Sequence, residues 1–149
     1  MGTRSINIIA NPKGDFIGSY CHWDGYPSHN GRILREHYSN KGKARKLVQL
    51  GSLSSLAERV APVCPELHSF DNREIGATVA YHRDRNEPWD EVKPVRTETL
   101  TELVQRGADM WCEYVYLFWN GHWSYNTVED ALAGKAYEPL TEENTQEQR

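Results

Sequence analysis

The sequence has few cysteines and no long apolar run. Its three cysteines, Cys21, Cys64 and Cys112, are an odd number and include no C-x-x-C pair, which argues against a disulfide framework and against a cysteine-based zinc site. No segment has the length of an apolar membrane span or the features of a secretory signal. We therefore expect a protein without disulfides or membrane contact, in a reduced, cytoplasmic setting.

The sequence also lacks the signatures of several large enzyme families. It contains no G-x-S-x-G, no H-E-x-x-H, no H-x-E paired with two cysteines, and no glycine-rich phosphate loop of the Walker or dinucleotide type. We identify no catalytic residue and expect no cofactor. Whether the protein is an enzyme stays open, but the sequence favours a protein that is not an enzyme.

Length and composition predict one folded domain. A chain of 149 residues buries about 68–70% of its unfolded surface, so a core can form without cross-links. Five Trp and eight Tyr supply rings both for that core and for recognition surfaces. We expect a single domain over residues 1–137, followed by a polar, acidic tail over residues 138–149 that frays.

Hydrophobic periodicity predicts an α+β fold, with a mainly antiparallel sheet of about five strands and helices packed on one face. Asn120-Gly121 indicates a two-residue hairpin turn. Residues 83–94 contain two prolines and are expected to form a loop. Strands are predicted over residues 3–10, 16–23, 75–82, 111–119 and 122–125. Helices are predicted over residues 29–38, 43–50, 52–60 and 99–106, with a short one from Thr127 to Gly134.

Two H-x-D motifs are the first candidates for chemistry. On an extended strand His22 and Asp24 share a face, and the same spacing recurs at His82 and Asp84. If the two strand ends lie side by side, the four side chains form a set suited to a divalent cation or to acid–base catalysis. Otherwise Asp24-Gly25 is simply a turn in a well-packed corner.

Arginines and rings near these motifs suggest recognition of an anion. Arg83 and Arg85 flank Asp84, and a guanidinium group binds phosphate or carboxylate in a bidentate manner. A local ion pair, in which Asp84 fixes one of the two arginines, is the alternative. The expected ligand-binding surface comprises Tyr20, His22, Trp23, Asp24, Tyr26, Arg32, His82, Arg83 and Arg85.

A basic run follows the first motif. Residues 30–48 contain six cations and only one acid, Glu36, although the whole chain has a net charge of −4. The run is either a solvated helix face or a patch that binds nucleic acid. Its cations are Arg32, Arg35, Lys41, Lys43, Arg45 and Lys46.

Five blocks in the same order carry a resemblance: MGTRS, YCHWDGYPSHNGRILREHY, LGSLSSL, TVAYHRDRNE and YVYLFWNGHW. Together they resemble a group of small uncharacterised proteins of bacteriophages and related mobile elements, over Met1 to about Trp123. The group has Gly where Asn86 stands. The resemblance implies a phage origin and a setting in the host cytoplasm, and it assigns no catalytic residue.

The sequence therefore predicts a phage accessory protein that acts by binding a host protein or a phosphate-bearing, nucleotide-like ligand, for instance to counter host defence. One alternative is a small metal-dependent hydrolase or nuclease that uses His22, Asp24, His82 and Asp84. Another is a nucleic-acid-binding protein that uses residues 32–46. Pairing of the chain with itself is left open.

Overall fold

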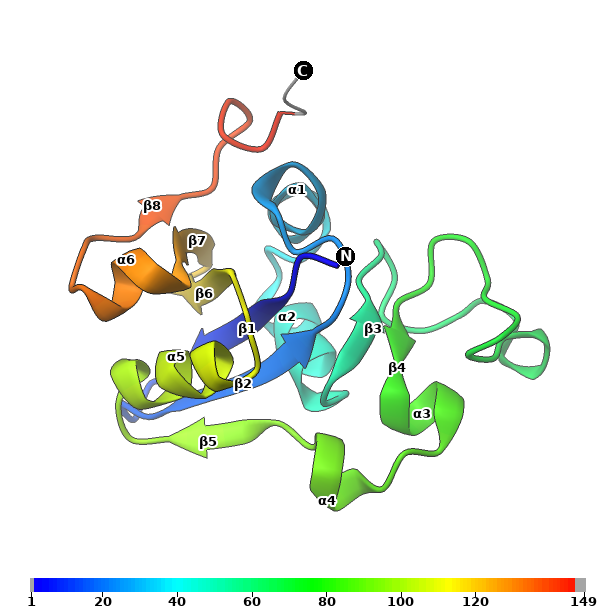
Figure 1. Cartoon of the computed structure of the whole chain (residues 1–149). Coiled ribbons are helices and arrows are strands. Elements are labelled where there is room, and N and C mark those ends of the chain that lie inside the picture. The colour runs from blue at the N-terminus through cyan, green and yellow to red at the C-terminus, as the bar shows by residue number, and fades with distance from the viewer. Residues whose placement is uncertain (1, 147–149) are drawn as a thin grey trace.

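The computed structural model describes residues 2–146 and shows a mixed sheet of eight strands flanked by helices (Figure 1). The strand order is β4-β3-β2-β1-β6-β7-β8, and β5 pairs separately with β2. The β1–β6 and β2–β3 pairs are parallel, whereas the other pairs are antiparallel. The strands are β1 (Ser5–Ala10), β2 (Phe16–Cys21), β3 (Leu53–Ser55), β4 (Val79–Ala80), β5 (Val95–Thr97), β6 (Tyr114–Trp119), β7 (His122–Thr127) and β8 (Glu138–Pro139).

The α+β prediction is confirmed, but the sheet is larger than about five strands and is mixed. The chain reaches β6 from β5 through the helix α5 (Leu100–Asp109), and this crossover lets β6 enter beside β1 in the same direction. Strands β3, β4, β5 and β8 have only two or three residues each. Alternation of polar and apolar residues cannot show in segments so short.

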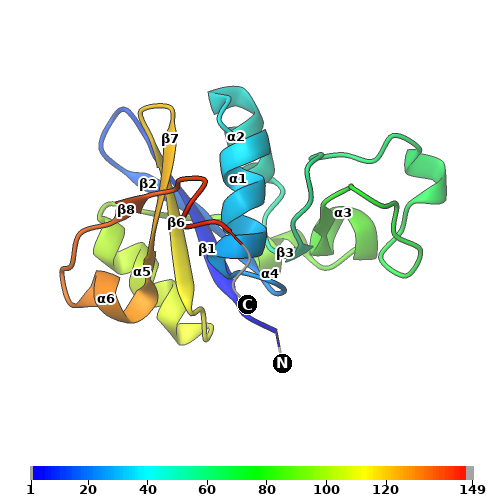
Figure 2. The same cartoon turned by 90° about the horizontal axis from the view of Figure 1, so that it is seen from above.

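Helices cover both faces of the sheet, so the prediction of helices on one face is wrong. Figure 2 shows α5 and α6 (Val128–Leu132) on one side of the strands, and α1 (Arg32–His37) and α2 (Lys41–Gln49) on the other. The physical reason lies in β1, which is buried over its first five residues and carries apolar side chains on both faces. A strand of this kind needs a covering layer on each side.

The two layers enclose two apolar clusters. On the α5–α6 side, Ile6 and Ile8 of β1 pack with Leu103 and Val104 of α5. On the α1–α2 side, Ile9 packs in a cluster that contains buried residues of both helices and of β6. All of these side chains are at most 2% exposed, so the sheet is the middle layer of the core.

Several local predictions are confirmed, and three are wrong. The hairpin turn at Asn120-Gly121 has φ values of 53° and 81°, as a two-residue turn between strands requires. The helix expected over 52–60 is instead β3 and extended chain, because Leu53 pairs with both Cys21 and Ala80. This pairing outweighs the helical spacing of the apolar residues.

The other two wrong predictions concern residues 75–94. The strand expected over 75–82 is reduced to β4, and the loop expected over 83–94 contains helical turns. These are α3 (Tyr81–Arg85) and α4 (Trp89–Val92); short turns of other helix types also occur at Pro27–Gly31 and Pro65–Leu67. Asn86 ends α3 with φ 60°, a left-handed conformation that glycine and asparagine both accept.

Residues 138–146 pack against the rest of the domain. β8 pairs with β7 at Ser124 and Tyr125, and Leu140 and Thr145 are 8% and 1% exposed. Fraying of the tail over residues 138–149 stays a prediction: apolar and hydroxyl groups of residues 138–146 pack on the domain, and residues 147–149 lie outside the described residues. None of the helices within residues 2–146 is long and apolar enough to span a bilayer.

The corner after β2 is tightly packed around Gly25. Its N–H donates to Thr3 O (2.8 Å), and its carbonyl accepts from the hydroxyl of Tyr116 (2.5 Å). A Cβ atom added to Gly25 would lie 2.7 Å from Ser5 Cβ, so only glycine fits. The buried Asn30 closes the corner by donating to Trp23 O (3.3 Å). The predicted packed corner is thus present, and it holds His22 and Trp23 at the end of β2.

Removing the Tyr116 hydroxyl tests this corner. We expect Tyr116→Phe to lower the free energy of unfolding by about 1–3 kcal/mol, because a buried carbonyl loses its donor. Tyr125→Phe is the matched control, since its hydroxyl makes an exposed contact with Glu138 at 3.4 Å and should change stability by less than about 0.5 kcal/mol. Urea unfolding measures both; equal effects would contradict the role given to Tyr116.

Candidate ligand-binding groove

The structure does not bring the two H-x-D motifs together. Cys21, Leu53 and Ala80 form one row across β2, β3 and β4, but β4 runs against the other two strands. The chain after Cys21 continues past Ser54, which accepts from Trp23 N–H, whereas Tyr81 N–H donates to Ser52 O on the opposite side of the row. The two segments therefore leave the sheet in opposite directions, and the predicted shared hollow is not formed.

The metal set predicted as an alternative is not assembled either. Within residues 2–146 no group of three or more His, Cys, Asp or Glu side chains is arranged to hold a metal ion. His22, Asp24, His82 and Asp84 are separated because β4 runs antiparallel to β3.

The Asp84 carboxylate has a structural role, because it is bound by neighbouring protein groups. Its side chain is 5% exposed, accepts from Ala80 N–H (2.8 Å), and pairs with Arg83 (3.0 Å). Arg83 also donates to Val60 O and Thr78 O, and His68 Nε2 lies 3.3 Å from the carboxylate. Burial alone would raise the pKa of Asp84, but the hydrogen bonds from Arg83 and Ala80 bring it below its usual range. The predicted local ion pair is therefore what the structure shows.

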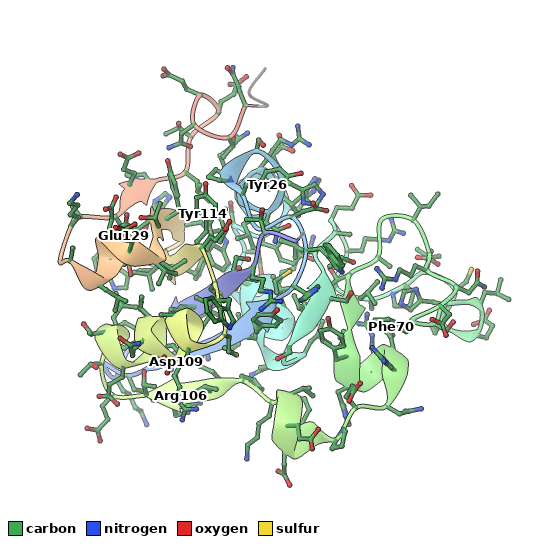
Figure 3. The ribbon with its side chains drawn as sticks, in the orientation of Figure 1. Tyr26, Phe70, Arg106, Asp109, Tyr114 and Glu129 are labelled. Carbon is green, nitrogen blue, oxygen red and sulfur yellow. The ribbon has the colours of Figure 1, made fainter. Side chains whose placement is uncertain are left out.

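His82 and Arg85 also have local partners. His82 Nδ1 donates to Glu87 O (2.8 Å), and its ring meets Trp89 edge-on. The Arg85 guanidinium group lies 4.8 Å from the ring centre of Phe70, which Figure 3 labels, and Arg73 lies 4.7 Å from the same ring. A ligand role for these residues stays a prediction, but it would belong to a surface separate from the first motif.

His22 and Trp23 line a groove of about 1160 Å³ on the α5–α6 side of the sheet. Its walls come from the segment before β1, the end of β2, the end of α5, the start of β6 and α6. Figure 3 labels Tyr114 and Glu129 among its lining residues. The groove contains four rings, one cation, two acids and apolar side chains: His22, Trp23, Trp111, Tyr114, Arg4, Glu113, Glu129, Val128 and Leu132.

Strand pairing explains why these residues meet. Ser5 pairs with Cys21 of β2 on one side and with Tyr114 of β6 on the other. The start of β1, the end of β2 and the start of β6 therefore lie at the same end of the sheet. The next residues outward, Arg4, His22 and Glu113, are neighbours there, and Glu113 N–H donates to Arg4 O (2.8 Å).

Arg4 is the one cation among the lining residues. Its Nη1 donates to Met110 O (3.3 Å), so part of its charge offsets the C-terminal end of α5. Among the residues that the structure describes, no carboxylate forms an ion pair with it. Burial, and then the positive charge of Arg4, lower the pKa of His22. The guanidinium group thus retains N–H donors without an acidic partner.

His22 provides a second donor. Tyr20 Oη lies 2.7 Å from His22 Nδ1, so this hydrogen bond occupies one of the two ring nitrogens, and burial raises the pKa of Tyr20 to about 12, so the hydroxyl stays protonated. Because the pKa of His22 is lowered, its ring is neutral near pH 7, and in the tautomer in which Tyr20 donates to Nδ1 the ring hydrogen sits on Nε2. Within the described chain Nε2 has no hydrogen-bond partner. The groove therefore presents Nε2 of a neutral imidazole, which is an N–H donor in that tautomer, beside the Arg4 side chain.

Other predicted site residues lie at the corner or elsewhere. Asp24 adopts φ 57° and accepts from Tyr26 Oη at 3.4 Å. Arg32 lines a separate cavity of about 380 Å³ together with His29 and His37.

The basic run is partly engaged. Lys43 lies over the Tyr38 ring (4.5 Å), Arg45 donates to Asn11, and Arg35 donates to Thr145. Nucleic-acid binding by residues 32–46 stays a prediction.

Comparison with known proteins adds no assignment: no protein-family model, curated protein or solved structure matches this chain. The resemblance to phage proteins stays a prediction. The functional argument therefore rests on the groove.

Asp84→Asn tests the structural role of this carboxylate. Because its pKa is lowered in the folded protein, the charged form adds stability above its unfolded pKa, and this contribution is lost as the pH falls through the lowered folded pKa. We expect a loss of about 2–3 kcal/mol at pH 7, shrinking below about pH 4. Urea unfolding across pH measures it. Asp90→Asn is the exposed control, and a pH-independent difference would contradict the assignment.

Arg4→Met tests whether the guanidinium charge reaches His22. Removing the charge should raise the pKa of His22 toward its ordinary value, although burial continues to lower it. An NMR titration of the His22 ring protons measures the shift. Arg106→Met, on α5 but lining a different cavity, should leave the pKa of His22 unchanged. An unchanged pKa in folded Arg4→Met would show that the two groups are not coupled.

Proposed function

We propose that the protein binds a phosphate-bearing small ligand in the groove between β1, α5 and α6, and that binding is its activity. The observation that carries the proposal is the partly buried Arg4, whose guanidinium group has no carboxylate partner among residues 2–146 and which lies beside the neutral imidazole of His22, whose Nε2 has no partner there. A partly desolvated cation is stabilised by an anion, and a guanidinium group matches the geometry of phosphate.

The uneven charge of the groove favours a small ligand over a nucleic-acid strand. Glu113 and Glu129 line the same groove as Arg4, so its charge is not uniformly positive. A long polyanion would place several phosphates near these acids, whereas a small ligand needs to place only one at Arg4 and His22. The cations of residues 32–46 lie on the other helical layer and do not extend this groove.

A neutral imidazole next to a cation also supports anion binding. Bound phosphate would accept from His22 Nε2–H and from Arg4, two donors whose positions are set by the β1–β2 pairing. Because these donors are already in place, little side-chain ordering is needed on binding. The phage origin, a role against host defence and binding of a host protein remain proposals that rest on the resemblance.

Calorimetry with ribose 5-phosphate and with ribose tests the proposal. We expect heat of binding from the phosphate ester and none from ribose. Arg4→Met should weaken binding at least about tenfold, as loss of a charged hydrogen bond predicts. Arg32→Met is the matched control, because Arg32 is exposed and lines another cavity. Absence of binding at millimolar concentrations, or equal loss in both variants, would overturn the proposal.

A further inference from the structure

Trp111 occupies a backbone position that normally favours glycine. It follows the last turn of α5, where Trp111 N–H donates to Ala108 O (3.0 Å) and Cys112 N–H donates to Gly107 O (2.9 Å). Its φ is +66°, in the left-handed region. At this position after a helix glycine is the usual residue, because a Cβ atom is unfavourable there. A tryptophan therefore lowers the stability of this turn.

The Trp111 ring contributes little to the stability of the fold, because most of it is exposed. The residue is 78% exposed and lines the groove, as does Trp23, which is 41% exposed. Trp23 is held in place: the His22 ring meets it edge-on at 4.7 Å, and the backbone of Gly2 packs against it. A large ring kept on a strained backbone and left in solvent indicates a surface that meets another molecule.

The position of Trp111 relative to Arg4 indicates which kind of molecule would bind at this surface. Arg4 donates to the carbonyl of Met110, the residue immediately before Trp111. The proposed phosphate position and the exposed indole are therefore neighbours, as phosphate and base are in a mononucleotide. Stacking of a planar base on an indole is favourable and tolerates many bases.

We infer that the ligand is a nucleoside monophosphate whose base stacks on Trp111. The inference rests on the proposed phosphate site and adds the ring to it. Glu113 and Glu129, lining the same groove, disfavour further phosphates and offer acceptors for amino groups on the base. The groove volume of about 1160 Å³ is ample for such a ligand, since small-molecule sites span about 300–1,000 Å³.

Trp111→Gly separates binding from folding. The variant should raise Tm by about 2–4 °C, because glycine relieves the left-handed strain. It should raise the Kd for adenosine 5′-monophosphate by about 5- to 150-fold, the effect of losing one stacked base. The Kd for ribose 5-phosphate should stay unchanged. Trp111→Phe should keep part of the affinity, because a phenyl ring also stacks.

Two control substitutions each share one property with Trp111, either the left-handed backbone or the exposed indole. Asn120→Gly changes another left-handed residue, φ 53°, on the hairpin turn, and it should not alter the affinity for the nucleotide. Trp119→Ala removes another exposed indole, 65% exposed, which lines a different cavity, and it should also leave the affinity unchanged.

The outcomes distinguish this inference from the proposed function. If wild type binds adenosine 5′-monophosphate and ribose 5-phosphate equally, stacking is overturned while the phosphate site stands. If neither binds, both fall. If Trp111→Gly also loses binding of ribose 5-phosphate, Trp111 has another role and the inference is overturned. The same holds if the variant loses binding of a host protein but still binds the nucleotide.

Discussion

The pairing of β1 on both of its edges is the constraint on which the rest of the molecule depends. Six residues of β1 pair with β2, and five pair with β6, while helices cover both faces. Arg4 precedes this strand, so its position is set by two neighbouring strands at once. The donors of the groove thus inherit the rigidity of the sheet centre, and a ligand meets groups that are already oriented.

The segment between β3 and β4 is held differently. It is mostly irregular, extends away from the sheet in Figure 2, and carries Val63, Leu67 and Ile75 in solvent. Leu56 and Val60 still pack against the core, but the outer part of the segment depends on polar contacts: Glu74 accepts from Val63 N–H and Cys64 N–H and pairs with Arg59. These hydrogen bonds, those from Val63 and Cys64 first, lower the pKa of Glu74 to about 2. The molecule therefore combines an apolar centre with an electrostatically stabilised arm.

Much of the fold could be predicted because β1, β2, β6 and the larger helices show periodicity or capping residues within a few positions. Thr99, for example, caps α5 by accepting from Glu102 N–H. Strands as short as β3 and β8 carry no such signal. In the groove, His22 and Trp23 were predictable from their motif, but Arg4 meets them only through the β1–β2 pairing, and Trp111 only through the parallel β1–β6 pairing. The direction of β4, which separates His82 from His22, is likewise a tertiary property.

Within the described part of the chain, residues 2–146, four non-glycine residues have left-handed backbones: Asp24, Asn86, Trp111 and Asn120. Asp and Asn tolerate this conformation, so three of the four need no special explanation. For Trp111, selection for stability alone would favour glycine, which suits the turn better. Natural variants of this chain consequently record whether the indole is under selection: a tryptophan retained at this position despite its conformational cost would mark a residue kept for what it touches.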